Sequence, residues 1–329
     1  LISARNTLLH LFDVMLCNEA TESVIESRVV HDENVLKCLF VCIFDTSLSE
    51  FVLNHLERLL NSHVNDALDF ENILTKIIDV FPRLVEHSTE GSIQLLMRLL
   101  EVVQEVFEGP NRKLLQSQMR PKLDSFIFML NFQVGNKTPT VTQHDLCIQV
   151  MRTLASLISG NNKSKKFLME NFGYDAVRDL ILQCENNKPT SELYDELFNL
   201  LVDGKFDMDT RCKITNSGIV RVMFQLCKYC PDTFVHAFLM KFITLVQKST
   251  HNRNVCCSAH LVAVLLELLP HYDDPKYFVD AETTRKGFKK QTGILNLIID
   301  LIEELGKHSI TVAELKLFFS LIKERSERV

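Results

Sequence analysis

The strongest constraint on the fold is a repeat in which a short polar segment is followed by two longer segments with apolar faces. The short segments are NNKSKKFLMENFG at 161–173, DTRCKITNSG at 209–218 and HNRNVCCSAH at 251–260. Their ends lie 45 and 42 residues apart. A period in the low forties with three helices per unit is typical of armadillo and HEAT repeats, and it exceeds the tetratricopeptide and ankyrin periods. The sequence therefore predicts an all-α fold, an armadillo/HEAT-like right-handed α-solenoid of stacked helical repeats.

The two longer segments of one repeat, 219–230 and 231–248, have the periodicity of buried helices. The apolar stripe of the second is too wide for a helix with a single neighbour, so we expect it to be sandwiched. Pro231 should occupy the first position of that helix, where its missing N–H has no intrahelical partner to lose. The stripes consist of Ile219, Val222, Met223, Leu226, Cys227 and Cys230, and of Phe234, Val235, Phe238, Leu239, Phe242, Leu245 and Val246.

The three short segments end at Gly173, Gly218 and His260. Two helices that cross almost at right angles need a junction residue that tolerates a positive φ or a close backbone approach, and glycine meets both needs. We therefore expect Gly218→Val to destabilise the array. His260 breaks the pattern and requires another solution at its junction.

The domain organisation predicted from these patterns is a single α-solenoid over 1–329. Residues 1–135 form less regular helical repeats, and 141–329 form regular armadillo-like ones. The segment 135–140 reads as a loop. The polar, aperiodic stretch 272–293 reads as a mobile surface loop. Because the chain opens inside a helical pattern and closes in a charged one, we expect a fragment of a larger protein.

Composition narrows the function classes. Only 10 Gly and 8 Pro beside 46% hydrophobic residues fit a helical chain with few turns. The formal net charge of −6 gives no electrostatic footprint for nucleic acid, which favours a basic domain. The ten cysteines lie mostly in apolar helical stripes, as reduced thiols of a cytoplasmic protein do. The longest apolar run, 261–269, is too short to cross a bilayer, so membrane association should be at most peripheral.

Residues with possible chemistry have simpler explanations. Cys227 and Cys230 form a C-x-x-C pattern, but both fall on the buried stripe of a helix, where thiols pack as small apolar groups. Cys256, Cys257 and His260, with His251 nearby, could ligate zinc, yet a second ligand pair at a defined spacing is missing. No histidine has a nucleophile and an acid at motif spacing. The sequence therefore predicts no enzyme, no metal and no cofactor.

Three segments of the regular half carry a family resemblance. LFNLLVDGKFD (197–207), NRNVCC (252–257) and ELGKHSITVAELKLFFSLIKER (304–325) resemble the armadillo-like region of BEACH-domain scaffold proteins. The resemblance covers 142–329 and is nearest to the branch with BEACH, WD40 and FYVE modules, followed by the neurobeachin and lysosomal-trafficking-regulator branches.

The resemblance implies a non-enzymatic protein-interaction scaffold that acts in vesicle trafficking or selective autophagy. Such a protein would be cytoplasmic, at the cytosolic face of vesicles or endomembranes, with protein partners and other modules of the same polypeptide as its contacts. The alternative within the binding class is the armadillo regulatory region of a formin-like actin regulator. An enzyme or a metal protein is the third class, and stoichiometric zinc in the purified protein would support it.

Candidate binding residues follow from the architecture, because the last helix of each armadillo repeat lines the concave surface. These helices are expected at 142–159, 190–202, 233–248 and 294–305. Their character becomes more acidic along the chain, which favours a partner peptide with basic residues, unless the stripes are merely solvated faces. The non-buried stripes consist of Gln149, Arg152 and Ser156; Glu192, Glu196 and Asn199; His236, Met240, Thr244 and Gln247; and Asn296, Asp300 and Glu303.

Overall fold

A computed structural model describes Thr7 and nine longer stretches of the chain. The residues that it describes are helices joined by turns and short extended segments, without a β-strand. The helical contacts divide the chain into two compact units, Leu1–Ser164 and Lys165–Val329, and each is considered by itself. The described stretches are 33–45, 48–61, 67–87, 90–109, 112–131, 142–184, 188–208, 212–272 and 293–326, together with Thr7.

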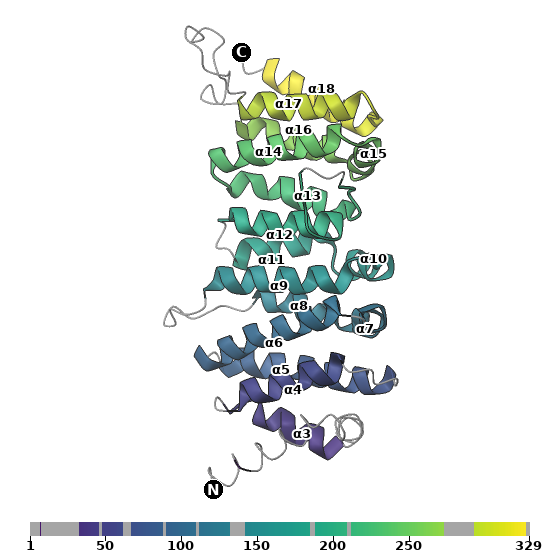
Figure 1. The fold of residues 1–329 in the computed structure, drawn as a ribbon. Helices are drawn as coiled ribbons and strands as arrows, with labels where there is room; N and C mark the ends of the chain where they lie inside the picture. Colours follow the sequence, from purple (N-terminus) through teal and green to yellow (C-terminus); the bar gives the residue numbers. More distant parts are fainter. Residues whose placement is uncertain are drawn as a thin grey trace. The chain divides into compact units, whose positions relative to one another are not determined.

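The first unit is a stack of helices in which α6 is the central element (Figure 1). It packs against α4, α5 and α9, and its residues Leu99, Leu100 and Val103 are fully buried. A proline in the interior of a helix either kinks the helix or ends it. Pro82 lies inside α5 and does not end it. The elements are α3 Glu33–Cys42, α4 Ser49–Asn61, α5 Ala67–His87, α6 Glu90–Glu108, α7 Arg112–Met119, η1 Arg120–Lys122, α8 Leu123–Phe128, η2 Met129–Asn131 and α9 Gln143–Ile158.

The second unit consists of two layers of helices (Figure 1). One layer runs α11, α13, α16 and α18, each packed on the next. The other runs α12, α14 and α17, and α12 also packs on α13 as α17 does on α16. The elements are α11 Tyr174–Cys184, α12 Ser191–Val202, α13 Ser217–Leu226, η3 Cys227–Tyr229, α14 Asp232–Gln247, α15 Thr250–Ser258, α16 Leu261–Leu268, η4 Leu269–Tyr272, α17 Ile294–Gly306 and α18 Val312–Ser326; α10, Asn162–Asn171, spans the division between the units.

An aromatic cluster between α12, α13 and α14 explains the wide apolar stripe of α14. Phe238 is 2% exposed, and its ring centroid lies 5.1 Å from those of both Tyr194 and Phe224. Edge-on aromatic contacts at this distance add to the free energy gained by burial alone. The expectation that this helix is sandwiched is confirmed.

The junctions differ in part from the expected register. Gly173 and His260 both have a positive φ, of 72° and 54°, and each directly precedes a helix. In the middle repeat the N-cap of α13 is Asn216, so the observed junction lies two residues before the predicted one, and Gly218 falls in the first helical turn. As the first of the three helices of its repeat, the short segment 209–218 should also be helical, and this prediction is wrong because residues 212–216 are not helical. Pro231 is the N-cap of α14, one residue before its expected position.

Two expected loops fall largely outside the described residues. All of 135–140 lies there, and so does 273–292 of the longer loop. Tyr272 is an exception, because it ends η4, is 1% exposed and donates a hydrogen bond to the carbonyl oxygen of Cys227 at 3.1 Å.

The length and hydropathy of a helix decide whether it could cross a membrane. Among the described residues no single helix is long and apolar enough to cross a bilayer. One pair, Thr250–Ser258 with Leu261–Tyr272, passes by length and composition only, and it is bent by 72°.

Candidate protein-interaction surface

The candidate residues on α9 are not the exposed stripe that we expected. Arg152 is exposed, but Gln149 is 5% and Ser156 is 7% exposed. The Gln149 amide donates to Gln104 Oε1 at 3.0 Å, and the Ser156 carbonyl accepts from Gln116 Nε2 at 2.9 Å. The expectation is therefore wrong at Gln149 and Ser156, because both are buried: the Gln149 amide bonds to α6, and the Ser156 hydroxyl donates to the carbonyl oxygen of Arg152 at 2.9 Å within α9.

On α12 the candidate residues divide between exposed and structural positions. Glu192 is exposed and Glu196 is half-buried. Asn199 donates to Glu196 Oε2 at 3.1 Å, and its Oδ1 accepts from the backbone N–H of Phe206 at 2.9 Å. Asn199 therefore fixes the loop that follows α12, in which Asp203 is left-handed with φ 59°.

The candidate residues on α14 lie at the surface of its layer. Met240 is 47% exposed, Gln247 is exposed, and His236 and Thr244 are half-buried. The Thr244 hydroxyl donates to the carbonyl oxygen of Met240 at 2.9 Å. An exposed methionine beside polar residues is a contact that a partner can use, because its flexible side chain adapts to different shapes.

Lys241 is a residue of this surface that sequence reasoning missed. Its Nζ lies 3.0 Å from Asp195 Oδ1 on α12, 4.3 Å from the centroid of the Phe198 ring and 4.8 Å from that of Phe206. The sequence did contain a signal for this residue, because Lys241 is a lysine inside an otherwise apolar stripe. The ammonium group ties α14 to α12 through an ion pair and cation–π contacts.

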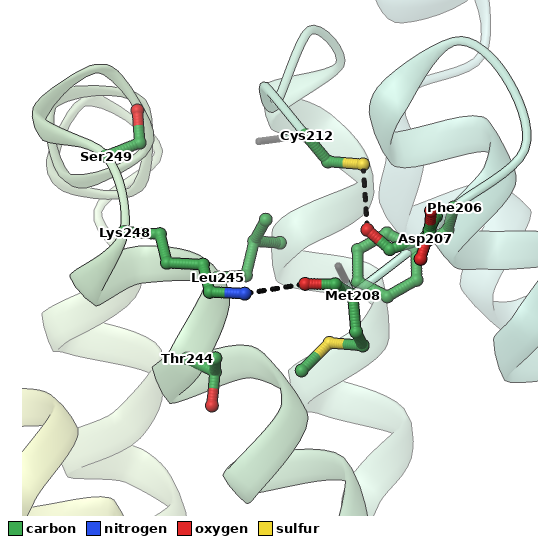
Figure 2. Close-up of a pocket in the computed structure, with 8 residues that line it drawn as sticks. All are labelled: Phe206, Asp207, Met208, Cys212, Thr244, Leu245, Lys248 and Ser249. Atoms are coloured by element: carbon green, nitrogen blue, oxygen red, sulfur yellow. Dashed lines mark hydrogen bonds between the residues drawn. The ribbon is translucent and has the colours of Figure 1, made fainter. Parts of the chain in front are cut away.

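A shallow pocket opens between the loop after α12 and the end of α14 (Figure 2). Leu245 is buried, whereas Thr244, one of the candidate residues, lies at the edge. The Lys248 ammonium donates to the Met208 carbonyl oxygen at 2.6 Å, and the Cys212 thiol donates to that of Asp207 at 3.3 Å. The Lys248 bond holds the loop against the end of α14, and the Cys212 bond joins two parts of the loop. The lining residues are Phe206, Asp207, Met208, Cys212, Thr244, Leu245, Lys248 and Ser249.

A neighbouring lysine offsets part of the negative charge of the candidate residues on α17. Asp300 and Glu303 are exposed and Asn296 is half-buried. Glu303 Oε1 lies 2.7 Å from Lys307 Nζ, and this hydrogen-bonded ion pair lowers the pKa of the Glu303 carboxyl and raises the pKa of Lys307. The structure thus places the candidates of α12, α14 and α17 on one layer, with Lys241 and Lys307 offsetting part of their negative charge.

A second polar cluster, also missed by sequence reasoning, joins α4 and α6 in the first unit. The guanidinium nitrogens of Arg98 lie 3.5 Å from Glu50, 3.8 Å from Glu57, 3.4 Å from Glu101 and 3.8 Å from Glu105. Burial, followed by the neighbouring Glu105 carboxylate, raises the pKa of Glu57. One cation serves four carboxylates, so the cluster keeps an excess of negative charge.

The thiols of the C-x-x-C pattern surround a buried phenol. Cys227 is 1% exposed, and its Sγ lies 3.7 Å from Tyr194 Oη, while Cys230 Sγ lies 3.6 Å from the same oxygen. Burial raises the pKa of both thiols, that of Cys230 to about 11, so thiolate is scarce at neutral pH. This arrangement confirms a core thiol at Cys227, whereas Cys230 is half-buried and lies just after η3 and not on a helix.

The described residues contain no group of three or more His, Cys, Asp and Glu side chains arranged to hold a metal ion. Cys256 itself is fully buried. His251 instead contacts the carbonyl oxygen of Ile214 through Nε2 at 2.9 Å.

Comparison with known proteins extends the resemblance to the whole chain. A family model described as the neurobeachin alpha solenoid region matches residues 1–329, whereas the sequence segments had suggested only 142–329. BEACH domain-containing protein B of Arabidopsis thaliana is 24% identical over 318 residues, which are 95% of this chain and 11% of that protein. A putative neurobeachin homolog of Caenorhabditis elegans is 24% identical over 157 residues, 47% of this chain and 6% of that protein. The chain therefore spans a small part of these relatives, and no solved structure matches it.

Proposed function

The chain belongs to the family of neurobeachin alpha solenoid regions, and from this premise we propose that it is a non-enzymatic scaffold module that binds protein partners. In this proposal it acts in vesicle trafficking or selective autophagy, at the cytosolic face of endomembranes, within a longer BEACH-domain polypeptide. The names of its relatives support the BEACH connection. The match over the full chain also favours this assignment over the formin-like alternative.

The observation that carries the proposal is the outer face of the layer α12, α14 and α17. It combines exposed carboxylates (Glu192, Asp300), an exposed Met240 and the shallow pocket beside Thr244. Solenoids use such extended surfaces of stacked helices for binding, because each repeat adds a similar strip. Burial raises the pKa of the Cys227, Cys230 and Cys256 thiols, which disfavours thiolate chemistry at these three residues.

The partner that fits this face is a peptide or protein segment with basic residues. Glu192 and Asp300 are exposed near the two edges of the layer, and Glu196 lies one turn from Glu192. Lys241 is engaged by Asp195 and two aromatic rings, so its charge is largely matched within the protein. Opposite charges at an interface mainly increase the association rate and exclude wrong partners.

Charge reversal tests the proposal. The triple variant Glu192→Lys, Glu196→Lys, Asp300→Lys should weaken binding of affinity-purified partners at least about tenfold and abolish its salt sensitivity. The matched control reverses three carboxylates of the other layer, Asp175→Lys, Asp179→Lys and Glu267→Lys. Both variants must keep the helical circular dichroism spectrum. If the two variants bind the same partners with unchanged affinity, the face of α12, α14 and α17 is not the binding surface.

A further inference from the structure

The helix α18 has an apolar side that no other element covers in the part of the chain that the structure describes. It packs mainly on α16, and its residues Leu317 and Leu321 are half-buried. Its other large apolar side chains are exposed at the C-terminal end of the second unit (Figure 1). Contiguous exposed apolar surface usually marks an interaction site. These residues, the α18 stripe, are Val312 (70% exposed), Leu315 (37%), Phe318 (40%), Phe319 (63%) and Ile322 (48%).

The spacing of the α18 stripe places its members along one side of the helix. Leu315 follows Val312 by three residues, and Phe319 follows Leu315 by four. Ile322 lies three residues beyond Phe319, which completes the interval pattern of a single helix face. Phe318 stands three residues after Leu315 and four before Ile322, so it borders the same face. The stripe is therefore one continuous apolar strip.

The helix that carries the stripe is fixed at its start. Glu314 is 3% exposed, and its Oε2 accepts hydrogen bonds from the backbone N–H of Thr311 at 2.7 Å and from the Thr311 hydroxyl at 2.8 Å. The Thr311 hydroxyl in turn accepts from the N–H of Glu314 at 3.2 Å, which completes a capping box. A ligand therefore meets a helix that is already formed, and binding does not carry the entropic cost of folding it.

Two lysines border the α18 stripe. Lys316 follows Val312 by four residues, and Lys323 follows Phe319 by four. Residues four apart are neighbours on the surface of a helix, so each lysine adjoins a member of the stripe. Both lysines are exposed. The edge of the stripe is therefore basic.

The carboxylates of α18 lie away from the stripe. Glu314 is buried, as described above. Glu324 is exposed, but at about 100° per residue it lies on the side of the helix opposite the middle of the stripe. The exposed carboxylates Asp300 and Glu303 belong to α17, in the other layer of the unit. The surface around the stripe thus combines apolar and positively charged groups.

We propose that the α18 stripe binds the surface of a membrane that contains anionic lipids. Its apolar side chains enter the boundary between the headgroups and the acyl chains, and the lysines reach the headgroup phosphates and carboxylates. Phenylalanine and leucine on one side of a helix, with lysines beside them, are the composition of helices that lie in this boundary. The inference rests on the proposed function only for its placement at endomembranes.

A second copy of the chain fits the stripe less well. An antiparallel pair of α18 helices would bring the edge with Lys316 and Lys323 beside the same edge of the other copy. Like charges at this distance repel each other. An anionic lipid surface attracts the same lysines, so charge favours the membrane.

Vesicle binding tests the proposal, and a tryptophan reports it because the chain contains no natural tryptophan. The full chain carrying Phe318→Trp is mixed with phosphatidylcholine vesicles that contain about one third phosphatidylserine. The tryptophan emission should move to shorter wavelength, and the chain should sediment with the vesicles. Binding to vesicles of phosphatidylcholine alone should be at least about fivefold weaker.

Substitutions in the stripe test its apolar part. Phe319→Ser combined with Ile322→Ser should weaken binding to the anionic vesicles at least about tenfold, because less apolar surface enters the membrane. The matched control is Met240→Ser combined with Tyr229→Ser, which changes two apolar residues with 47% and 44% exposure outside α18. The control should bind as the parent chain does.

Charge reversal tests the basic edge. Lys316→Glu combined with Lys323→Glu should weaken binding to the anionic vesicles at least about fivefold and remove the preference for them. The control, Lys205→Glu combined with Lys228→Glu, reverses two exposed lysines elsewhere in the second unit and should keep that preference.

Several outcomes would overturn the proposal. These are a parent chain that does not bind the anionic vesicles, serine variants of the stripe that bind as the parent does, and controls that lose binding. A dimer seen by analytical ultracentrifugation without lipid, and lost in Phe319→Ser with Ile322→Ser while vesicle binding persists, would assign the stripe to a second copy. A double variant that loses its helical circular dichroism spectrum is replaced by Phe319→Ser or Lys316→Glu alone, for which the same outcomes apply.

The test is independent of the one for protein partners. The variant Glu192→Lys, Glu196→Lys, Asp300→Lys leaves the α18 stripe intact and should still bind the anionic vesicles. Loss of vesicle binding in the stripe variants with retained protein partners, or the reverse, therefore shows which of the two proposals has failed.

Discussion

At the scale of single residues, Gly218 shows why a small side chain can be required inside an ordinary helix. A Cβ built there would lie 1.9 Å from Tyr174 Cε2, although its φ is not in the left-handed region. The Tyr174 ring cannot retreat easily, because it is half-buried and its hydroxyl donates to Asn216 Oδ1 at 2.6 Å. Of the two reasons predicted for this glycine, close approach is the one that applies.

Gly218→Ala should lower the free energy of unfolding by about 1–3 kcal/mol, and Gly218→Val by more, because the added carbons overpack the site. Urea denaturation measures the effect. Removing the ring with Tyr174→Ala should relieve part of the cost in the double variant, since the two residues are in contact. Gly306→Ala, whose Cβ would meet nothing within 4 Å, is the control and should be neutral. Equal costs at both glycines would contradict the steric explanation.

The Arg98 cluster gives a pH-dependent prediction. The pKa of Glu57 is raised in the folded protein, so the folded state binds its proton more tightly than the unfolded chain does. Stability associated with this group is present at low pH and is lost as pH rises through the folded pKa. Glu57→Gln removes the titration, and it should raise the melting temperature at pH 7 relative to the parent chain.

Differential scanning calorimetry at pH 7 and pH 4 checks this sign. The gain from Glu57→Gln should shrink or reverse at pH 4, where the parent residue is protonated. Glu108→Gln, which changes an exposed carboxylate of α6 that does not pair with Arg98, serves as the control. A melting temperature lowered at pH 7 would show that the ion pair with Arg98 outweighs burial and repulsion.

At the scale of elements, the short helix α15 holds residues 212–216 in place. These residues are not helical, although a helix was expected at 209–218. Asn252 is completely buried, and its side chain accepts from Ile214 N at 2.9 Å. It also donates to the carbonyl oxygens of Cys212 at 3.0 Å and Leu245 at 2.9 Å. The Asn252 amide thus forms hydrogen bonds with backbone groups of Cys212, Ile214 and Leu245. Because these bonds pair the backbone groups of Cys212 and Ile214, those groups need no helical hydrogen bonds.

Asn252→Leu should therefore destabilise the second unit by about 2–4 kcal/mol, because buried backbone groups lose their partners without access to water. Hydrogen exchange should report faster exchange at Ile214 N–H in particular. The exposed neighbour Asn254 provides the comparison, and Asn254→Ala should change stability by less than about 0.5 kcal/mol. Similar effects of the two substitutions would argue against this role of the Asn252 amide.

At the scale of the whole molecule, each unit depends on the stacking of neighbouring layers. Leu301 and Leu305 of α17 are fully buried, and α17 packs on both α14 and α16. In contrast, α18 has an exposed apolar face and packs mainly on α16. Loss of α17 should therefore matter much more than loss of α18.

A chain ending at Leu269 should be less soluble, and its thermal transition should fall by about 5–10 °C, since the faces of α14 and α16 become exposed. A chain ending at Ser309, which lacks only α18, should lose much less. Circular dichroism melting and limited proteolysis compare the two. If the shorter chain melts like the full one, the stacking order assigned to α14, α16 and α17 is wrong.

Much of the architecture was predictable from local patterns. The stripes of 219–230 and 231–248 correctly predicted buried helices, and the family resemblance was correct and extends over the whole chain. The candidate surface was predictable in part. Met240 is exposed as expected, whereas Gln149 and Ser156 are buried. A polar side chain does not reveal whether a neighbouring helix covers it and supplies its hydrogen bonds.

The sequence by itself determined that this protein is a stack of helices, because helical periodicity connects residues three and four apart and can be read within one segment. Only the tertiary structure decided which polar residues are buried and form contacts inside the protein. Asn252 meets a segment 38 residues earlier, and Tyr174 covers a glycine in the next repeat. The His260 imidazole meets a carboxylate from α18. These contacts join residues that are distant in the sequence, and their energies depend on burial and geometry that no local pattern encodes.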